Sequence, residues 1–278
     1  MTTAPPDPDP RTGGLLHALS ILMSPARFEA LEPTHGAVPY ADGSRRGVAP
    51  LCDVYLPSKS APYPSVVVVH GGGFVIGHRR MKPVRLIATR LCQAGFAVCS
   101  VDYRLLLRGG GLDAQVEDVS AAAAFWRASS SRFGCDPERI SMLGFSAGAS
   151  LMILHAAASE HAYHRLVSLY GALDFDRMSG RRAELLLGMV LGTRDRGVWK
   201  ARSPSAHAHM SSPLLTIHGT ADDLVPVAHA TRLHESRRAR GLPSELELVP
   251  GMRHGWLSDA SLPESEQAVA RVVAFLRA

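Results

Sequence analysis

The clearest candidate for chemistry is a serine flanked by glycines, in Gly144-Phe145-Ser146-Ala147-Gly148. This G-x-S-x-G pattern lies between an apolar run at 140–143, typical of a strand, and an alanine-rich stretch at 147–158, typical of a helix. So tight a turn strains the serine backbone, and the glycines remove side chains that would clash there. The hydroxyl would lie at a helix N-terminus, where amides favour developing negative charge. The pattern predicts that Ser146 is a nucleophile.

A glycine-rich loop supplies the second candidate. His70-Gly71-Gly72-Gly73-Phe74 directly follows the apolar run 66–69. Successive glycines let backbone N–H groups point into a cavity, so the amides of Gly72 and Gly73, together with that of Ala147, could bind an oxyanion. A flexible turn or a phosphate-binding loop is the alternative. We favour the oxyanion hole because no Lys-Ser/Thr follows, as a phosphate loop would require, and no GxGxxG begins a helix.

A serine hydroxyl needs a base to take its proton and an acid to orient that base. Asp222 and Asp223 both follow the apolar run 214–217, and His254 follows the run 246–249. Every candidate therefore lies in a loop after a strand, where open parallel sheets bind their ligands. His218 is interpreted as structural, because it is too close to Asp222 along the chain to be the base.

The elements that must position these residues alternate between short apolar runs and longer helical patterns, which indicates a mostly parallel sheet with helices on its faces. The predicted strands are 66–69, 97–101, 140–143, 166–169, 214–217 and 246–249, with 48–56 at an antiparallel edge; the predicted helices are 80–94, 113–132, 147–158, 226–240 and 263–277. Residues 48–278 are expected to form one doubly wound domain. A short insertion at 171–212, which includes the apolar stretch 185–191, is expected to form a small cap.

The N-terminal region is expected to differ from this domain. Residues 1–13 are rich in proline and acid and predict a disordered tail, and residues 14–47 predict a helix and cap region. Apolar residues from Leu15 to Met23 recur at helical spacing, so this helix would pack on the domain surface or line the substrate entrance. No signal peptide or membrane span is evident, and we expect a cytoplasmic protein.

Composition excludes several classes of function. The chain has 278 residues, is 46% hydrophobic and carries a formal net charge of +5. Its basic residues form scattered short clusters, so a solvated basic surface is preferred to a nucleic-acid site. The four cysteines show no CxxC spacing, which argues against a disulfide framework or a zinc site. The pairs His161/His164 and His207/His209 have no Cys, Asp or Glu at ligand spacing, and they are interpreted as surface residues.

Five motifs occur together in one order along the chain: HGGGF, Asp102-Tyr103-Arg104-Leu105, GFSAG, HGTADDLVP and GMRHGW. From about residue 48 to 278 the chain resembles the α/β-hydrolase family, in particular its carboxylesterase branch related to hormone-sensitive lipase and small acyl esterases. The resemblance implies the α/β-hydrolase fold, with a mostly parallel sheet of about eight strands. It also favours Asp222 over Asp223 as the acid, and it implies that residues 102–104 are structural. The sequence departs from the lipase branch at Phe145, where an acidic residue is usual, and at 106–115, where prolines are usual.

These observations predict a serine hydrolase that cleaves small or short-chain carboxylic esters through an acyl-enzyme. Ser146, Asp222 and His254 would be its triad, and Gly72, Gly73 and Ala147 its oxyanion hole. We expect no cofactor or metal, a small-molecule ester as partner, no nucleic acid, and either a monomer or a homodimer. An aryl formamidase is the alternative enzyme, because similar proteins that cleave formyl amides pair HGGG with GxSxG. A non-catalytic receptor of the same fold is the rival from another class, but known examples have lost the base and this chain retains His254.

Overall fold

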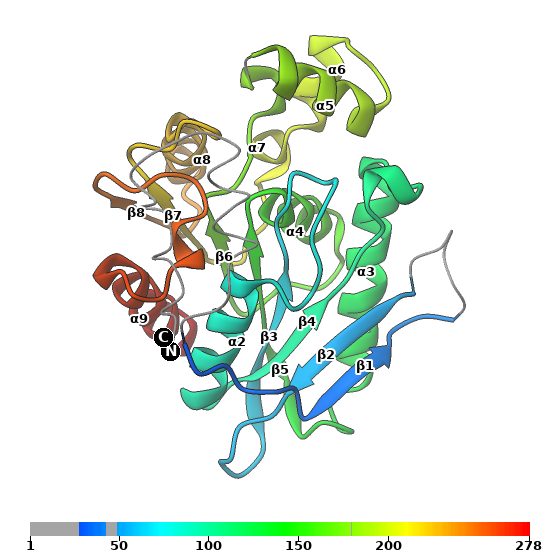
Figure 1. Ribbon diagram of the computed structural model, residues 1–278, viewed down its shortest axis with the longest axis vertical. Coiled ribbons are helices and arrows are strands. Elements are labelled where there is room, and N and C mark those ends of the chain that lie inside the picture. The colour runs from blue at the N-terminus through cyan, green and yellow to red at the C-terminus, as the bar shows by residue number, and fades with distance from the viewer. Residues whose placement is uncertain (1–27, 43–48, 179) are drawn as a thin grey trace, which may run out of the picture.

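The core of the molecule is one sheet, shown in the computed structural model of Figure 1, which describes residues 28–42, 49–178 and 180–278. Its strands within these ranges are β1 (His35–Pro39), β2 (Leu51–Tyr55), β3 (Tyr63–Val69), β4 (Ala97–Val101), β5 (Cys135–Phe145), β6 (Leu166–Leu169), β7 (Leu214–Gly219) and β8 (Ser244–Val249). They are ordered β1-β2-β4-β3-β5-β6-β7-β8. The pairs β1–β2 and β2–β4 are antiparallel, and all other neighbouring strands are parallel. The predicted mostly parallel sheet is confirmed.

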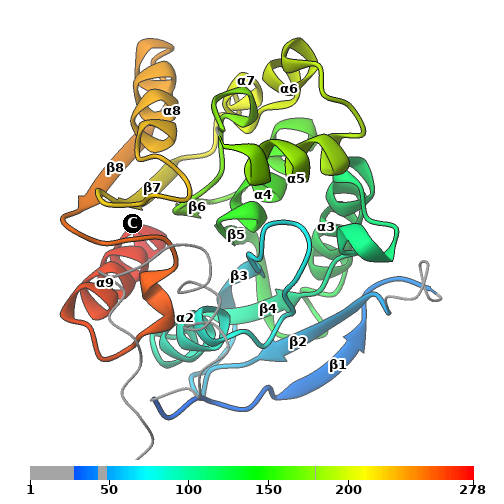
Figure 2. The ribbon, with the colours of Figure 1, turned by 45° about the horizontal axis from the view of Figure 1, so that its top comes forward.

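Helices cover both faces of this sheet (Figure 2). They are α2 (Lys82–Gln93), α3 (Leu112–Ala128), α4 (Ala147–Ala158), α8 (Ala228–Ala239) and α9 (Pro263–Arg277), with short 3-10 turns η1 (Leu106–Arg108) and η3 (Trp256–Ser258). Apolar residues of α3, α4 and α8 belong to one core cluster, and those of α2 and α9 belong to a second. The central strand β3 is buried on both faces of the sheet: Val66 to Val69 are all 0% exposed.

The sheet begins earlier in the sequence than predicted. Strand β1 lies within the region 14–47 that was expected to form a helix and cap, and it occupies the edge outside β2. Residues 48–56 therefore contain an antiparallel strand, as predicted, but not the edge strand. The side chains of β1 are mostly exposed, so no alternation of apolar residues marks this strand in the sequence. The predicted tail at 1–13 and the helix around 15–23 lie outside the described residues.

The insertion after β6 holds four short elements, η2 (Phe175–Arg177), α5 (Arg181–Leu191), α6 (Arg196–Arg202) and α7 (Pro204–His207). Figure 1 shows α5 and α6 together beyond one end of the sheet. Helix α5 turns Leu187, Val190 and Leu191 inward, which is the i, i+3, i+4 pattern of an amphipathic helix. These elements fall within the segment 171–212 in which a cap was expected.

Within the ranges that the structure describes, no helix combines the length and the apolar character that crossing a bilayer requires.

Candidate active site

Ser146 lies in a strained turn between β5 and α4. Its φ of 48° and ψ of −116° fall in a region that residues with a side chain rarely occupy, at a cost of about 1–3 kcal/mol. Close packing enforces this turn: a Cβ added to Gly144 would lie 2.5 Å from the Cα of Ala149. One added to Gly148 would lie 2.3 Å from the carbonyl oxygen of His70. The two flanking glycines are therefore steric requirements, as the motif predicted.

Two hydrogen bonds connect Ser146 to an acid through a histidine. His254 Nε2 lies 2.8 Å from Ser146 Oγ, and His254 Nδ1 lies 2.8 Å from Asp222 Oδ2. An ionised carboxylate can only accept, so Nδ1 carries the proton and Nε2 is left to accept from the serine hydroxyl. The structure thus brings together the three side chains that the sequence singled out, in the orientation that lets the histidine act as a base.

Asp222, and not its neighbour Asp223, reaches His254. Oδ1 of Asp222 accepts hydrogen bonds from the backbone amides of Leu224 and Val225, at 3.0 and 2.8 Å, which fix the carboxylate in the loop after β7. Asp223 instead forms an ion pair of 2.6 Å with Arg253 near the surface. The preference for Asp222 agrees with this geometry.

A second histidine supports the acid. Nε2 of His218 lies 3.1 Å from Asp222 Oδ2 and 2.9 Å from the carbonyl oxygen of Val225. Burial would raise the pKa of the Asp222 carboxyl, but His254 and His218 outweigh it and hold that pKa well below its usual value. His218 is therefore a structural residue, as interpreted from the sequence, although its contact with Asp222 was not anticipated. It keeps Asp222 ionised.

The glycine-rich loop packs directly on the serine turn. A Cβ added to Gly71 would lie 3.0 Å from the carbonyl oxygen of Phe145 and 3.2 Å from the Cβ of Ser146. Gly72 has a φ of 121°, and its carbonyl oxygen accepts hydrogen bonds from the amides of Val75 and Ile76 in a tight turn. The loop thereby brings the amides of Gly72 and Gly73 to the same end of the sheet as that of Ala147, the first residue of α4. An amide in that first position has no acceptor within its helix.

His70 and Tyr103 hold this loop in place through hydrogen bonds and ring stacking. Nδ1 of His70 donates to the carbonyl oxygen of Gly71 at 2.7 Å. The hydroxyl of Tyr103 donates to the backbone carbonyl oxygen of His70 at 3.0 Å. The two rings are stacked with centroids 4.2 Å apart. Burial lowers the pKa of His70 to about 4, so the ring is neutral near pH 7. Tyr103 is structural, as the resemblance implied, and the role of His70 was not anticipated.

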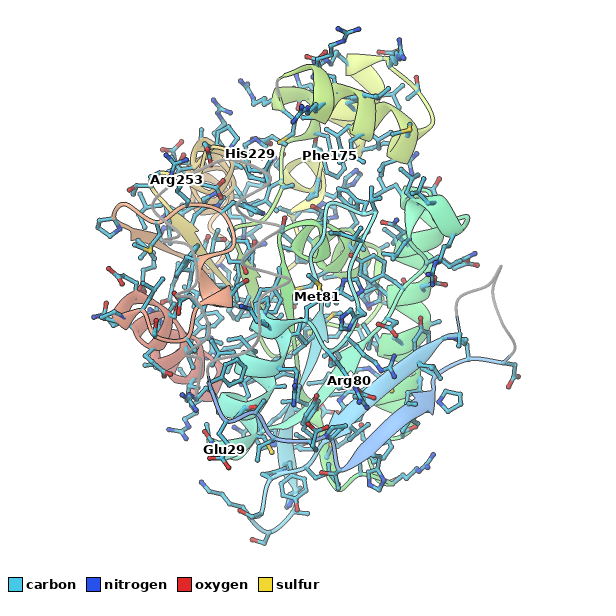
Figure 3. All side chains as sticks on the ribbon, in the orientation of Figure 1. Glu29, Arg80, Met81, Phe175, His229 and Arg253 are labelled. Carbon is cyan, nitrogen blue, oxygen red and sulfur yellow. The ribbon has the colours of Figure 1, made fainter. Side chains whose placement is uncertain are left out.

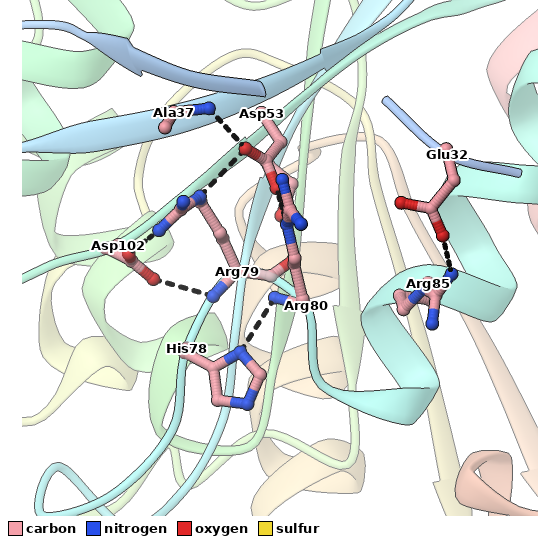
Figure 4. A network of polar contacts seen from close by, with 9 residues as sticks. Glu32, Ala37, Asp53, His78, Arg79, Arg80, Arg85 and Asp102 are labelled. Carbon is pink, nitrogen blue, oxygen red and sulfur yellow. Dashed lines mark hydrogen bonds and ion pairs between the residues drawn. The ribbon is translucent and has the colours of Figure 1, made fainter. Parts of the chain in front are cut away.

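Charged residues fasten the far end of the same loop (Figure 4). Arg79 Nε lies 2.9 Å from Asp53 Oδ1, and the backbone amide of Arg79 donates to Asp102 Oδ1 at 2.6 Å. The guanidinium of Arg79 also pairs with Asp102, and Arg80 pairs with Asp53. Asp53 is fully buried on β2, and burial would raise its pKa, but Arg80, Ala37 and Arg79 together lower it. The loop is thus tied to β2 and to the residue after β4.

An aromatic residue that sequence reasoning missed packs against the base. Tyr170, just after β6, makes an edge contact with the ring of His254 and another with that of Trp256, both with centroids 5.0 Å apart. Its φ of 42° turns the chain sharply at this point. The side chain is 3% exposed, and it limits the directions in which His254 can move.

The cap is held at its base by His229 of α8. Nδ1 of His229 accepts from the backbone amides of Leu173 and Asp174, each at 3.1 Å. Figure 3 shows His229 beside Phe175, at the junction of α8 and the cap. Phe175 in turn makes an edge contact with Phe74 of the glycine-rich loop, with centroids 6.1 Å apart. The cap and the glycine-rich loop are therefore in direct contact.

In the part of the chain that the structure describes, no three His, Cys, Asp or Glu side chains form a group that could hold a metal ion. All four cysteines are buried and reduced.

Several known proteins with similar sequences are named esterases. Residues 52–236 match the model of the BD-FAE family. Esterase LipC of Mycobacterium tuberculosis is 31% identical over 235 residues, which span 75% of this chain and 57% of LipC. The probable isoprenylcysteine alpha-carbonyl methylesterase ICMEL1 of Oryza sativa subsp. japonica is 28% identical over 229 residues, 73% of this chain and 53% of that protein. The chain thus spans just over half the length of these curated relatives.

Solved structures share the fold. An acetyl ester-xyloside bifunctional hydrolase from Caldicellulosiruptor lactoaceticus superposes with a TM-score of 0.78 at 20% identity, covering 90% of this chain and 98% of that one. The butyrate-bound esterase Est2 from Thermogutta terrifontis gives a TM-score of 0.73 at 22% identity, covering 88% and 94%. The α/β-hydrolase fold is thereby confirmed.

The steric demand on the glycine-rich loop can be tested by substitution. A Cβ on Gly72 would lie 1.9 Å from the carbonyl oxygen of Ile76, whereas Gly251 also has a positive φ, of 72°, but no atom within 4 Å of the added Cβ. We expect Gly72→Ala to reduce the free energy of unfolding by at least about 2 kcal/mol more than Gly251→Ala does. Urea unfolding of both variants measures this. Equal losses would show that backbone strain alone, and not the contact with Ile76, restricts the position.

The attachment of the cap should depend on pH. Burial lowers the pKa of His229 to about 4 from its ordinary value of 6.5, so folding favours the neutral ring. The stability that His229 contributes is fully present above pH 6.5 and is lost as the pH falls towards 4. At pH 5 the free energy of unfolding is expected to be lower by about 2 kcal/mol for this reason. The stability difference between wild type and His229→Asn, measured by urea unfolding, should therefore shrink by about this amount from pH 7.5 to pH 5. His209→Asn, at an exposed position, is the control. If the stability difference between wild type and His229→Asn changes no more with pH than that of the control, the role assigned to His229 is wrong.

Proposed function

Because this chain belongs to the BD-FAE family, we propose that it is a carboxylic ester hydrolase that cleaves small or short-chain esters with Ser146 as nucleophile. The observation that carries the proposal is the continuous path from Ser146 Oγ through His254 to Asp222, with both hydrogen bonds 2.8 Å long. The esterase names of the sequence relatives support the same class of reaction.

The reaction follows from the protonation states at this site. His254 Nε2 takes the proton of Ser146 as its Oγ attacks the ester carbonyl carbon, and the ionised Asp222 stabilises the imidazolium that forms. The tetrahedral oxyanion lies against the amides of Gly72, Gly73 and Ala147, where rigid donors stabilise it more than they stabilise the flat carbonyl. His254 then protonates the departing alcohol, which leaves an acyl-enzyme. A water molecule activated by the same ring releases the acid.

Small acyl groups are favoured by the cap. A Cβ on Gly73 would lie 3.7 Å from Cδ2 of Leu186, so α5 covers the loop that holds the oxyanion. Phe175 approaches from the other side through its contact with Phe74. We expect these apolar side chains to limit the room for the acyl group of a substrate. Two structural neighbours are an acetyl ester-xyloside bifunctional hydrolase and an esterase with bound butyrate, and acetyl and butyryl are acyl groups of this size.

The nucleophile is tested by initial rates on p-nitrophenyl esters from acetyl to decanoyl, with N-formylkynurenine beside them. We expect acetyl or butyryl esters to be preferred and Ser146→Ala to lower kcat/KM by at least about 10⁴-fold. Cleavage of the formamide alone would favour an aryl formamidase. No turnover of any substrate, with Ser146 unreactive, would favour a ligand receptor on the same fold.

The acid is tested by a matched pair of neighbouring substitutions. Asp222→Asn should reduce kcat by about 10³- to 10⁴-fold, because the amide no longer holds His254 in the tautomer that accepts from Ser146. Asp223→Asn removes only a surface ion pair and should change kcat by less than about twofold. Similar losses in both variants would show that the whole loop, and not the Asp222 carboxylate, determines the rate.

A further inference from the structure

Exposed apolar side chains gather where the cap meets the glycine-rich loop. Among the described residues, large apolar side chains that are well exposed include Ile76 (41%), Leu107 (79%), Leu185 (51%) and Met189 (49%). These four belong to the loop after β3, to η1 and to α5. Isolated exposed apolar residues are ordinary, but several on adjoining segments mark an interaction surface.

Contacts between the three segments make this one surface. The amide of Leu106 donates to the carbonyl oxygen of Phe74 at 2.9 Å, which joins η1 to the loop of Ile76. A Cβ on Gly111 would lie 3.5 Å from the carbonyl oxygen of Val190, and Gly73 faces Leu186, so α5 packs against both. Figure 2 shows α5 beside the loop between β3 and α2 and beside the start of α3.

On its exposed side, helix α5 carries two apolar residues flanked by two arginines. Successive residues are about 100° apart around a helix, so Arg181, Leu185, Met189 and Arg182 fall in that order within an arc of about 100°. Leu187, on the opposite side, is buried. Leu186, next to this arc, faces Gly73. The exposed arc therefore borders the residue that covers the glycine-rich loop.

The surroundings of this arc are positively charged. Residues 171–212 hold seven arginines and lysines against four acids, a net charge of +3 within a chain whose formal charge is +5. Arg108, Arg177, Arg181 and Arg182 are exposed, and none has an acidic partner among the described residues. The neighbouring acids Glu184 and Asp113 are already engaged by Arg196 and Arg202.

We propose that this cap face, made of Ile76, Leu107, Leu185, Met189, Arg108, Arg177, Arg181 and Arg182, binds an anionic lipid surface and directs the site towards esters carried by that surface. Apolar side chains would enter the boundary between headgroups and acyl chains, and the arginines would contact phosphates. Since Leu186 lies between this face and Gly73, a docked molecule would present lipid-borne esters to Ser146 without their passing through water. The inference about substrate rests on the proposed function, whereas the binding does not.

Binding is tested with the Ser146→Ala protein, which cannot consume the lipid. Sedimentation with phosphatidylcholine vesicles is compared with and without phosphatidylglycerol. We expect binding at least about tenfold stronger to the anionic vesicles, and weaker as salt is added. Added substitutions Leu185→Gln with Met189→Gln should weaken binding about tenfold, and Arg181→Glu with Arg182→Glu should remove the preference for anionic lipid. Leu248→Gln, at an exposed position of β8, is the matched control.

Activity provides the second measurement, on proteins that retain Ser146. The cap-face variants should hydrolyse p-nitrophenyl acetate in solution at the wild-type rate, but should lose about tenfold on the same class of ester presented in anionic vesicles. Equal sedimentation of wild type and cap-face variants would overturn the proposal. So would a wild-type dimer in gel filtration that these variants convert to monomer, because the face would then bind a second copy. An inactive wild type that still binds vesicles would contradict the proposed function alone.

Discussion

The close packing of the Ser146 turn against the glycine-rich loop constrains the rest of the site. Gly148 touches the carbonyl oxygen of His70, and Gly71 touches Ser146, so the nucleophile and the loop cannot be displaced independently. A side chain is excluded at Gly148, where an added Cβ would lie 2.3 Å from the carbonyl oxygen of His70, and one at Gly71 would require the Ser146 turn to shift. The strained backbone of Ser146 persists because β5, α4 and this loop are fixed around it. His70, Tyr103 and Arg79 then have one shared effect, which is to hold the loop in place.

Buried titratable groups around the site include both neutral histidines and ionised carboxylates. His70 and His229 are buried and neutral near pH 7, and each uses Nδ1 to fix backbone, the first at the glycine-rich loop and the second at the base of the cap. Asp222 is buried and ionised, because two histidines and two amides surround its carboxylate. The carboxylate of Asp222 lies 2.8 Å from His254 Nδ1, where it would stabilise positive charge on that ring.

The parts of this structure that depend on local pattern were predictable from the sequence. Buried strands such as β4 and β6 have the predicted bounds, because continuous apolar runs mark strands that are covered on both faces. Motifs at the ends of predicted strands singled out Ser146, Asp222 and His254, the three side chains that the structure brings together. Strand β1 was missed because its side chains are exposed. Tyr170 and the clamp of Asp53 on Arg79 were missed because they depend on contacts between distant segments, which no spacing in the sequence records. The contact of His218 with Asp222 is local, but it depends on how the loop after β7 folds. Spacing alone also could not separate Asp222 from its neighbour Asp223, so that choice rested on the resemblance to the α/β-hydrolase family.

The central claim is that His254 and Asp222 activate Ser146 for attack on an acyl carbon. It is tested most directly by treating the protein with a fluorophosphonate ester, which phosphonylates an activated serine, and locating the adduct by mass spectrometry of peptides. The account predicts one adduct, on Ser146, formed at least about 10³-fold more slowly in His254→Ala, because the hydroxyl then lacks its base. An adduct on another residue, or labelling of Ser146 at the same rate without His254, would contradict it.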